Sequence, residues 1–487
     1  MLETERQIWY AAFKAKDTRF DGRLFVGVSS TGIYCRPICR AKMPKAENCT
    51  FYTTAAEAEQ AGFRPCLICR PELAPGNAPV DATSSLAHRA ARLLEALCGS
   101  EQSIGEAAHR LGCTDRHLRR AFTAEYSVSP VQYLQTCRLL LAKNLLTDTD
   151  LSVIDVAMAA GFGSLRRFND LFKKQYNLVP TALRRQAATA KNKESNVTLT
   201  LGYRPPYQWQ QMLDFLALRA IPGVEVVRDG EYLRTVHFET SGQRHVYGWI
   251  RVGHQPKKNA LTVTVDIALL PVLTQVLARV RHLFDLHCDP DAVYETLVTM
   301  NDIRPGLCVL GVRVPGSFEP FEMAVRAVLG QQITVKGART LAARLVEKHG
   351  VPIQTGIEGL TNVFPSPQEI LALDGPISNH LGPLGIIGAR ANTIFELARA
   401  FVQKDVDFNF CAQPETEVQR LMSVPGIGTW TAQYIAMRAM GWPDAFLHTD
   451  YGIKKALEPR TPKEILGLAE AWRPWRSYAT VNLWNYL

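Results

Sequence analysis

The pattern of apolar and polar residues predicts an antiparallel sheet followed by a helical region in the second half of the chain. "VTLTLGY" (197–203) and "ALTVTVDI" (260–267) alternate apolar and polar residues, which is the period of half-buried strands. From about residue 272 almost to the end, the period becomes helical. We therefore expect a small antiparallel β domain and then an all-α domain.

An internal repeat precedes these strands. "LGCTDRHLRRAFTAEYSVSP" (111–130) resembles "AGFGSLRRFNDLFKKQYNLVP" (160–180), and each copy follows an amphipathic helical pattern. A glycine between two short helices, Gly112 or Gly161, is typical of a helix-turn-helix. Two such units can place recognition helices in successive major grooves, although solvated helix faces carry the same charges. The basic residues concerned are Arg116, Arg119, Arg120, Arg166, Arg167, Lys173 and Lys174.

Two segments without apolar periodicity divide the chain. "APGNAPVDATSS" (74–85) and "QAATAKNKESNV" (186–197) are rich in small or polar residues and indicate linkers. The fold class predicted is multidomain α+β. We expect a small cysteine-bearing domain, an all-α double helix-turn-helix domain, an antiparallel β-sheet/α domain and an all-α domain, at residues 1–78, 84–186, 197–283 and 284–487.

Charge and hydropathy narrow the class of protein. The 487 residues carry a net charge of +9 with a pI of about 9.0, which weakly favours a polyanionic partner such as nucleic acid. The start, "MLETERQIWY", lacks the apolar core of a signal peptide, and Asp266 and Pro271 interrupt the longest apolar run. We therefore expect a cytoplasmic protein with no membrane partner, whose cysteines are reduced.

Four cysteines form two close pairs, Cys35-x3-Cys39 and Cys66-x2-Cys69. Paired short spacings are typical of one tetrahedral zinc site. Four thiolates on one zinc would carry a net charge of about −2 and be nucleophilic at neutral pH. On spacing alone, a purely structural zinc is the favoured interpretation. Four neighbouring arginines would offset the charge and attract a DNA phosphate: Arg36, Arg40, Arg64 and Arg70.

The segments "TGIYCRPICRAKMPKAENCTFY" and "AAGFRPCLICRP" resemble the N-terminal domain of the Ada alkylation-response family. The resemblance implies that Cys35, Cys39, Cys66 and Cys69 bind Zn²⁺. It also implies that Cys35 accepts a methyl group from a DNA methylphosphotriester. Residues 85–185 resemble the AraC-type DNA-binding domain. The two resemblances together imply a zinc-containing sensor domain followed by a DNA-binding domain that regulates transcription.

Near the C-terminus, "LMSVPGIGTWTAQYIAMRAM" (421–440) predicts a helix, a Pro-Gly-x-Gly turn and a second helix. Gly426 and Gly428 would let backbone N–H groups approach a phosphate, although an ordinary helix-connecting turn has the same pattern. Asp450, in "FLHTDYGIKKAL", directly precedes a helical pattern. Taken alone it is a helix N-cap, a role that is compatible with facing a cleft.

From about Val197 to Leu487 the chain resembles the helix-hairpin-helix glycosylases of the AlkA type, on "RPGLCVLGVRVPGSFEPFEMAVRAVLGQQ", "VPGIGTWTAQY" and "AWRPWRSYATVNLW". The resemblance implies a catalytic Asp450, a base pocket of Trp430, Tyr434 and Trp484, and Gln332 as the residue that wedges into the DNA. Gln332 is polar where the AlkA protein has an apolar wedge. The family has a pair of aspartates here, and in this chain Thr449 occupies the first position of that pair and Asp450 the second.

Related lyases carry a lysine where this chain has Trp430, and often a later cluster of iron-binding cysteines. Here the last cysteine is Cys411, before Asp450. We therefore expect a monofunctional hydrolase without an iron–sulfur cluster or organic cofactor.

The combined interpretation is an alkylation-response fusion that binds double-stranded DNA as a nucleoid-associated monomer and contacts RNA polymerase. Its rivals are a pure regulator whose glycosylase region only binds DNA, and a constitutive repair enzyme whose first two domains only add affinity.

Overall fold

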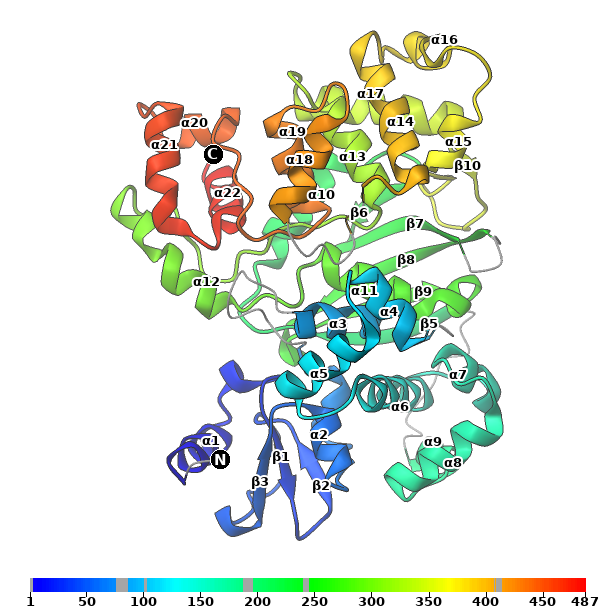
Figure 1. The fold of residues 1–487 in the computed structure, drawn as a ribbon, viewed down its shortest axis with the longest axis vertical. Helices are drawn as coiled ribbons and strands as arrows, with labels where there is room; N and C mark the ends of the chain where they lie inside the picture. The colour runs from blue at the N-terminus through cyan, green and yellow to red at the C-terminus, as the bar shows by residue number, and fades with distance from the viewer. Residues whose placement is uncertain are drawn as a thin grey trace.

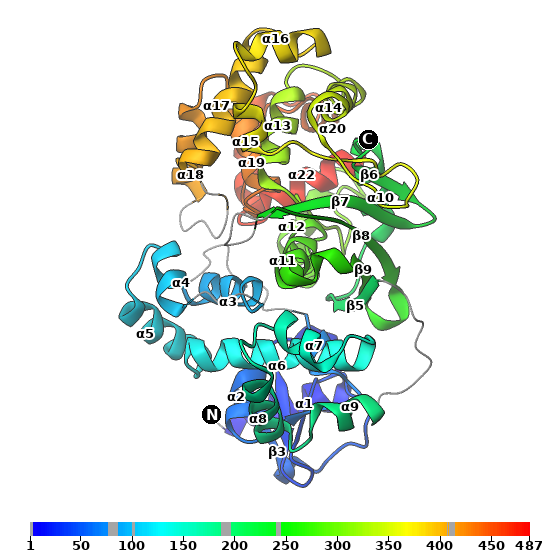
Figure 2. The same cartoon turned by 90° about the vertical axis from the view of Figure 1, so that its right-hand side faces the viewer.

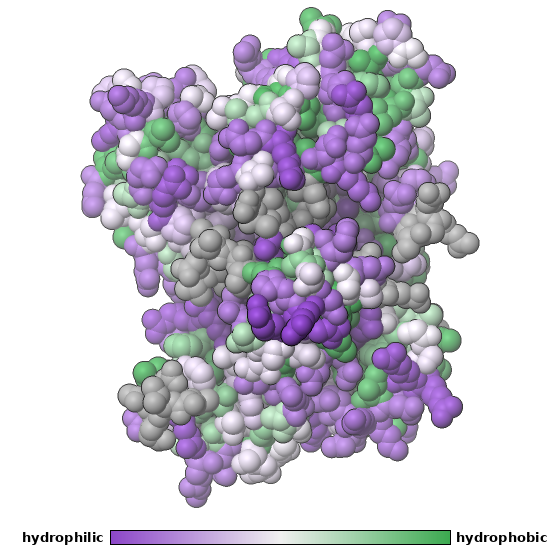
Figure 3. Space-filling model, in the orientation of Figure 1, coloured by the Kyte–Doolittle hydropathy of each residue, from purple (hydrophilic) through white to green (hydrophobic). Residues whose placement is uncertain are grey.

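The structure is a computed structural model that describes residues 3–75, 86–99, 103–186, 196–239, 245–406, 408 and 414–487. The predicted linkers fall largely outside these residues, as does Cys411. The N-terminal region lies at one end of the long axis with the last helices of the repeat at the same level, the rest of the repeat lies in the middle, and the C-terminal helices lie at the other end (Figure 1). Hydrophilic side chains predominate on the face in Figure 3, where apolar ones are scattered.

The N-terminal region, called the head below, is a four-stranded sheet in the order β3-β1-β2-β4. β1 (Phe25–Val28) pairs antiparallel with β3 (Cys49–Tyr52) and β2 (Ile33–Cys35), and β2 pairs parallel with β4 (Arg64–Pro65). Helices α1 (Glu3–Ala15) and α2 (Ala55–Gln60) complete it. Because β2 ends at Cys35 and Cys66 follows β4, this pairing brings the two cysteine pairs together.

The predicted repeat is confirmed as two helix-turn-helix units. The first consists of α4 (Ile104–Arg110) and α5 (Asp115–Tyr126), and the second of α7 (Val153–Ala159) and α8 (Leu165–Tyr176). Gly112 and Gly161 have φ of +70° and +78°, the left-handed region that favours glycine. The 19-residue α6 (Pro130–Asp148) joins the units, which are flanked by α3 (Leu86–Ala96) and α9 (Pro180–Gln186).

The predicted antiparallel sheet is also confirmed. Its five strands are ordered β5-β9-β8-β7-β6, with Val197 opposite Val265 and Leu201 opposite Leu261. The second half of the chain continues as helices, with one departure from the all-α prediction: β10 (Val351–Pro352) pairs with β11 (Asn362–Val363) after Gly350 ends α14. The bounds are β5 Asn196–Gly202, α10 Trp209–Arg219, β6 Glu225–Arg228, β7 Glu231–Glu239, β8 His245–Gln255, β9 Ala260–Asp266, α11 Leu273–Leu283, α12 Pro290–Leu297, α13 Pro320–Leu329, α14 Val335–His349, α15 Pro367–Leu371, α16 Ile377–Leu381, α17 Ala389–Gln403, α18 Pro414–Ser423, α19 Thr429–Arg438, α20 Tyr451–Ala456, α21 Pro462–Leu468 and α22 Arg476–Asn485.

The second helix-turn-helix unit and the five-stranded sheet share one hydrophobic core. Phe168 and Phe172 of α8 belong to the same buried cluster as Leu199 of β5 and Val263 of β9. The views agree that α6 and α7 lie beside this sheet (Figures 1 and 2). The repeat is therefore packed against the C-terminal half rather than tethered to it.

The head contacts the repeat through Glu59 of α2, which is buried. Its carboxyl accepts hydrogen bonds from Tyr34 (3.0 Å), Thr136 of α6 (3.0 Å) and Tyr176 of α8 (3.3 Å). Burial raises the pKa of Glu59 to about 8, although these hydrogen bonds oppose the shift. Strand β2 is thus linked by one side chain to the joining helix α6 and to α8 of the second helix-turn-helix unit. Within the described part of the chain, no helix combines the length and apolar character needed to cross a bilayer.

Candidate functional site

The C-terminal helices enclose a cavity of about 410 Å³. Asp450, Trp430, Tyr434 and Trp484 all line it, although they are spread over more than fifty residues of sequence. Trp430 and Tyr434 lie on α19, directly after the hairpin turn, and Trp484 lies on α22. The fold therefore brings together the residues that the resemblance singled out for catalysis and base binding, while their roles stay predictions.

Asp450 is the N-cap of α20, as the local sequence predicted. Its Oδ1 accepts backbone hydrogen bonds from Gly452 (2.9 Å) and Ile453 (3.2 Å). The indole N–H of Trp484 donates to the same oxygen at 2.9 Å, whereas that of Trp430 donates to Oδ2 at 3.1 Å. Oδ1 has three donors and Oδ2 has one, so Oδ2 keeps more of its capacity to accept a proton or face a cation.

The ring faces of the pocket aromatics are partly occupied by one another. Trp430 and Tyr434 are stacked, with centroids 5.2 Å apart and planes at 10°. Trp484 stacks against Phe215 of α10 at 6.1 Å and 21°. Trp484 therefore contributes an N–H to the carboxylate as well as a ring to the wall.

Besides the exposed Arg339, three arginines that the sequence patterns did not single out line the cavity: Arg219, Arg326 and Arg438. Each is flanked by apolar residues in a helical segment, "ALRAI", "AVRAV" and "AMRAM". A cation in an apolar helical stretch is rarely buried without a partner. An arginine flanked by apolar residues is therefore the sequence signal that could have identified these three positions.

The other residues expected to contact DNA are close in sequence to residues that line the cavity. Gln332 is exposed in the turn between α13 and α14, with φ of +56°. Gly426 has φ of +88°, and a Cβ there would lie 1.9 Å from Thr393 Oγ1. Packing against Thr393 and backbone conformation thus already require this glycine. Gly428 begins α19 in open space.

The basic residues of the repeat lie on the surface. Arg116, Arg119 and Arg120 of α5 are exposed, as are Arg166, Arg167, Lys173 and Lys174 of α8. The apolar partners in each helix, such as Phe122 and Phe172, are buried. Each recognition helix therefore presents cations on one face and anchors its opposite face in a core.

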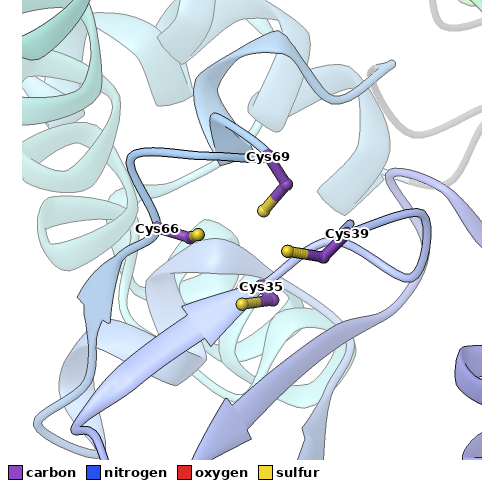
Figure 4. Close-up of side chains that lie close together, drawn as sticks. All are labelled: Cys35, Cys39, Cys66 and Cys69. Atoms are coloured by element: carbon purple, nitrogen blue, oxygen red, sulfur yellow. The ribbon is translucent and has the colours of Figure 1, made fainter. Parts of the chain in front are cut away.

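The four cysteines of the head converge (Figure 4). The Sγ atoms of Cys35, Cys39, Cys66 and Cys69 all lie within 4.8 Å of one another, close enough to share one ion. Cys69 is half-buried and the other three are buried, so exposure does not single out Cys35 as the reactive one. Backbone N–H groups of Arg36 and Ile68 donate to the Cys69 and Cys66 sulfurs at 3.3 and 3.4 Å.

Without a cation, the four thiols do not all ionise readily, because hydrogen bonds within the cluster favour ionisation of some and oppose that of others. Hydrogen bonds within the cluster raise the pKa of Cys35, chiefly the bond to Cys39, and lower the pKa of Cys66, chiefly the bond to Cys35. A divalent cation removes this conflict because it stabilises all four thiolates together. The donor set therefore fits zinc.

Two of the four neighbouring arginines are not available to a DNA phosphate, contrary to the expectation from sequence. Arg36 is buried against Asp21 and also donates to the Cys69 carbonyl at 3.2 Å. Arg70 pairs with Asp148 of α6 (2.8 Å) and with Glu72 (3.0 Å). Carboxylates close in space but distant in sequence engage both guanidinium groups.

Three known families match parts of the chain. The family described as "Metal binding domain of Ada" matches residues 8–72, a helix-turn-helix family matches 107–186, and the "AlkA N-terminal domain" matches 198–319. Among solved structures, a 3-methyladenine DNA glycosylase from Archaeoglobus fulgidus aligns with a TM-score of 0.47 and 21% identity, over 59% of this chain and 97% of that chain.

Curated relatives cover the whole chain or one half of it. A "Probable bifunctional transcriptional activator/DNA repair enzyme AlkA" of Mycobacterium tuberculosis is 36% identical over 98% of this chain and 96% of its own length. "DNA-3-methyladenine glycosylase 2" of Escherichia coli is 36% identical over 58% of this chain and 96% of its own. "Bifunctional transcriptional activator/DNA repair enzyme Ada" of the same organism is 36% identical over 33% of this chain and 43% of its own.

Proposed function

The chain belongs to the family of bifunctional transcriptional activator/DNA repair enzymes AlkA, and we propose that Asp450 is the catalytic carboxylate of its DNA glycosylase region. The protein is an alkylation-damage response protein: a glycosylase that hydrolyses the N-glycosidic bond of alkylated purines of the 3-methyladenine type, fused to an Ada-type zinc head and a DNA-binding repeat. The domain ranges 1–78, 84–186, 197–283 and 284–487 are part of the proposal.

One observation carries the catalytic assignment: a carboxylate lies in the wall of an aromatic cavity with one oxygen largely uncommitted. Cleavage of a glycosidic bond passes through an oxocarbenium-like state. The negative charge of Asp450 would stabilise that cation, and Oδ2 would orient the attacking water. The base must first leave the DNA stack, and Trp430, Tyr434 and Trp484 supply the aromatic walls that receive it.

The decisive experiment measures release of 3-methyladenine from methylated DNA by the wild type and by Asp450→Asn under single-turnover conditions. Asparagine retains an oxygen for the N-cap, so the fold and DNA binding should survive. We expect the excision rate to fall by about 10²- to 10³-fold, the range for removal of one transition-state-stabilising group. Equal rates would contradict the assignment.

For the head, we propose suicidal methyl transfer at Cys35. Zinc held by the four cysteines keeps the sulfurs as thiolates and strongly nucleophilic. The Cys35 sulfur would form a bond to the methyl carbon of a methylphosphotriester. The methyl carbon–oxygen bond breaks, and its electron pair stays on the phosphate oxygen, which leaves an ordinary phosphodiester. Methylation removes one negative charge from the head, which weakens its repulsion of DNA and is expected to tighten promoter binding.

Because Cys69 is the more exposed thiol, the test must locate the methyl group. Incubation with DNA that carries labelled methylphosphotriesters should leave the label on the peptide that contains Cys35, not on the one that contains Cys69. Label on the Cys69 peptide would overturn the choice of acceptor. Cys35→Ser should accept no label, and its promoter affinity at fixed salt should not respond to methylated DNA.

The remaining partners follow from the proposed roles. The exposed arginines of α5 and α8, with Gln332, Gly426 and Gly428 of the glycosylase region, would contact double-stranded DNA. A monomeric activator bound at a promoter would contact RNA polymerase and reside in the nucleoid. The glycosylase would be monofunctional, because Trp430 stands where a lyase carries its lysine.

A further inference from the structure

The base pocket contains a cation that its proposed substrate does not explain. Alkylation at N3 or N7 makes a purine positively charged, yet three guanidinium groups, besides that of the exposed Arg339, line the cavity. A cation beside a cationic base is unfavourable unless carboxylates neutralise it. The contacts of the three arginines decide which of them is available to a ligand.

Two of the three are committed to the protein. Arg326 donates to Glu225 and Glu322, both at 2.8 Å. Arg438 donates to the carbonyls of Pro315 and Gly316, at 2.8 and 3.0 Å, and to the Tyr434 hydroxyl at 2.9 Å. Carboxylates thus neutralise the charge of Arg326, and protein oxygens accept hydrogen bonds from Arg438.

Arg219 differs from both. Within the described ranges no carboxylate forms an ion pair with it; its guanidinium donates a long hydrogen bond, 3.3 Å, to the Phe215 carbonyl and also interacts with the Tyr434 hydroxyl. The guanidinium lies 3.7 Å over the Phe215 ring, in the row of rings that continues to Trp484. Arg326 donates to the Arg219 carbonyl and so anchors its backbone at the end of α10. Burial lowers the pKa of Arg219 to about 10, a value that still leaves it charged at neutral pH.

A guanidinium has five N–H donors. The Phe215 carbonyl and the Tyr434 hydroxyl engage only some of those of Arg219, and the guanidinium lies in the wall that receives the base. When the C1′–N9 bond of a purine nucleotide breaks, the electron pair of that bond stays on the base. A cationic alkylpurine leaves as a neutral base and gains little from a nearby cation. A neutral purine leaves with negative charge on its ring and exocyclic oxygen, and that charge is what a guanidinium stabilises.

We infer that Arg219 is a specificity-determining residue that stabilises the departing base of neutral purine lesions, while Asp450 stabilises the cationic sugar. The inference rests on the proposed glycosylase function. Excision of cationic alkylpurines would then require Asp450 but not Arg219, whereas excision of neutral oxopurines would require both residues.

The test compares two otherwise identical duplexes, one with 7-methylguanine and one with hypoxanthine, under single-turnover conditions. Arg219→Gln should lower the excision rate of hypoxanthine at least tenfold and change that of 7-methylguanine less than threefold. Arg219→Lys keeps a charge and should recover part of the hypoxanthine rate. Arg339, which also lines the cavity but is exposed, provides the matched control. Arg339→Gln should affect both duplexes equally, through DNA binding.

An equal loss on both duplexes with Arg219→Gln would mean a structural role and overturn the inference. So would an unchanged hypoxanthine rate, or a wild type that excises 7-methylguanine but not hypoxanthine. A wild type that excises neither base contradicts the proposed glycosylase function itself, so the two failures are distinguishable.

Discussion

The indole N–H of Trp484 donates a 2.9 Å hydrogen bond to Oδ1 of Asp450. Together with the N–H groups of Gly452 and Ile453, it saturates that oxygen and fixes the orientation of the carboxylate. The side chain predicted as a stacking surface for the base therefore also positions the proposed catalytic group.

Replacement of Trp484 by phenylalanine should separate these two roles. Trp484→Phe keeps an aromatic ring against Phe215 but removes the N–H donor. A hydrogen bond to a charged group contributes about 1.5 to 3 kcal/mol, so kcat for 3-methyladenine release should fall about ten- to a hundredfold while KM changes little. A rise in KM with unchanged kcat would mean that Trp484 acts only through stacking.

The chemistry at Trp430 predicts an intact abasic strand as the DNA product. Tryptophan has no amine to form a Schiff base with the sugar. Incubation with damaged DNA and borohydride should therefore trap no covalent protein–DNA adduct, and the strand should break only after alkali treatment. A trapped adduct would identify a lysine nucleophile elsewhere and a bifunctional enzyme.

The buried Glu59 predicts that the contact between head and repeat weakens as pH rises. Its pKa is about 8 in the fold against 4.5 in an exposed carboxyl, so the folded protein holds a proton that the unfolded chain releases between these values. The free energy of unfolding of this part of the chain should then decrease across that window, by up to about 1.4 kcal/mol per pH unit. Lys143, Tyr34 and Tyr176 face the same carboxyl, and Lys143 moderates the effect.

Glu59→Gln isolates this contribution, because an amide of the same shape does not titrate. Urea unfolding of the wild type and the variant at pH 6, 7 and 8 should show a steeper loss of stability with pH in the wild type. Parallel pH profiles would mean that Glu59 is ionised in the fold.

Removal of zinc should release four thiols. Treatment with a strong chelator should expose Cys35, Cys39, Cys66 and Cys69 to a thiol reagent and make the head protease-sensitive, because the ion would hold β2 and the loop after β4 together. Cys49 provides the control, since it is buried in the same head but lies outside the cluster. Cys49→Ser should bind as much zinc as the wild type; a loss of zinc there would contradict the ligand set.

The sequence predicts what is local and misses what depends on distant pairing. The N-cap role of Asp450, the turns at Gly112 and Gly161, and the strand period of 197–203 follow from neighbouring residues, and the structure confirms them. The ion pair between Arg70 and Asp148 joins residues 78 positions apart, so Arg70 looked like a free phosphate ligand. The lack of a carboxylate partner for Arg219 among the described residues could not be predicted for the same reason, because Glu225 and Glu322, distant in sequence, pair with Arg326.

The shared core of the second helix-turn-helix unit and the five-stranded sheet has a consequence for any attempt to divide the protein. A boundary placed between α9 and β5 follows the sequence but cuts through a packed interior, because Leu145, Phe172, Leu199 and Val263 belong to one cluster. A fragment that starts at β5 would present to water an apolar surface that α6 and α8 now cover. We expect such a fragment to need replacement of these apolar side chains by polar ones to avoid self-association through that surface.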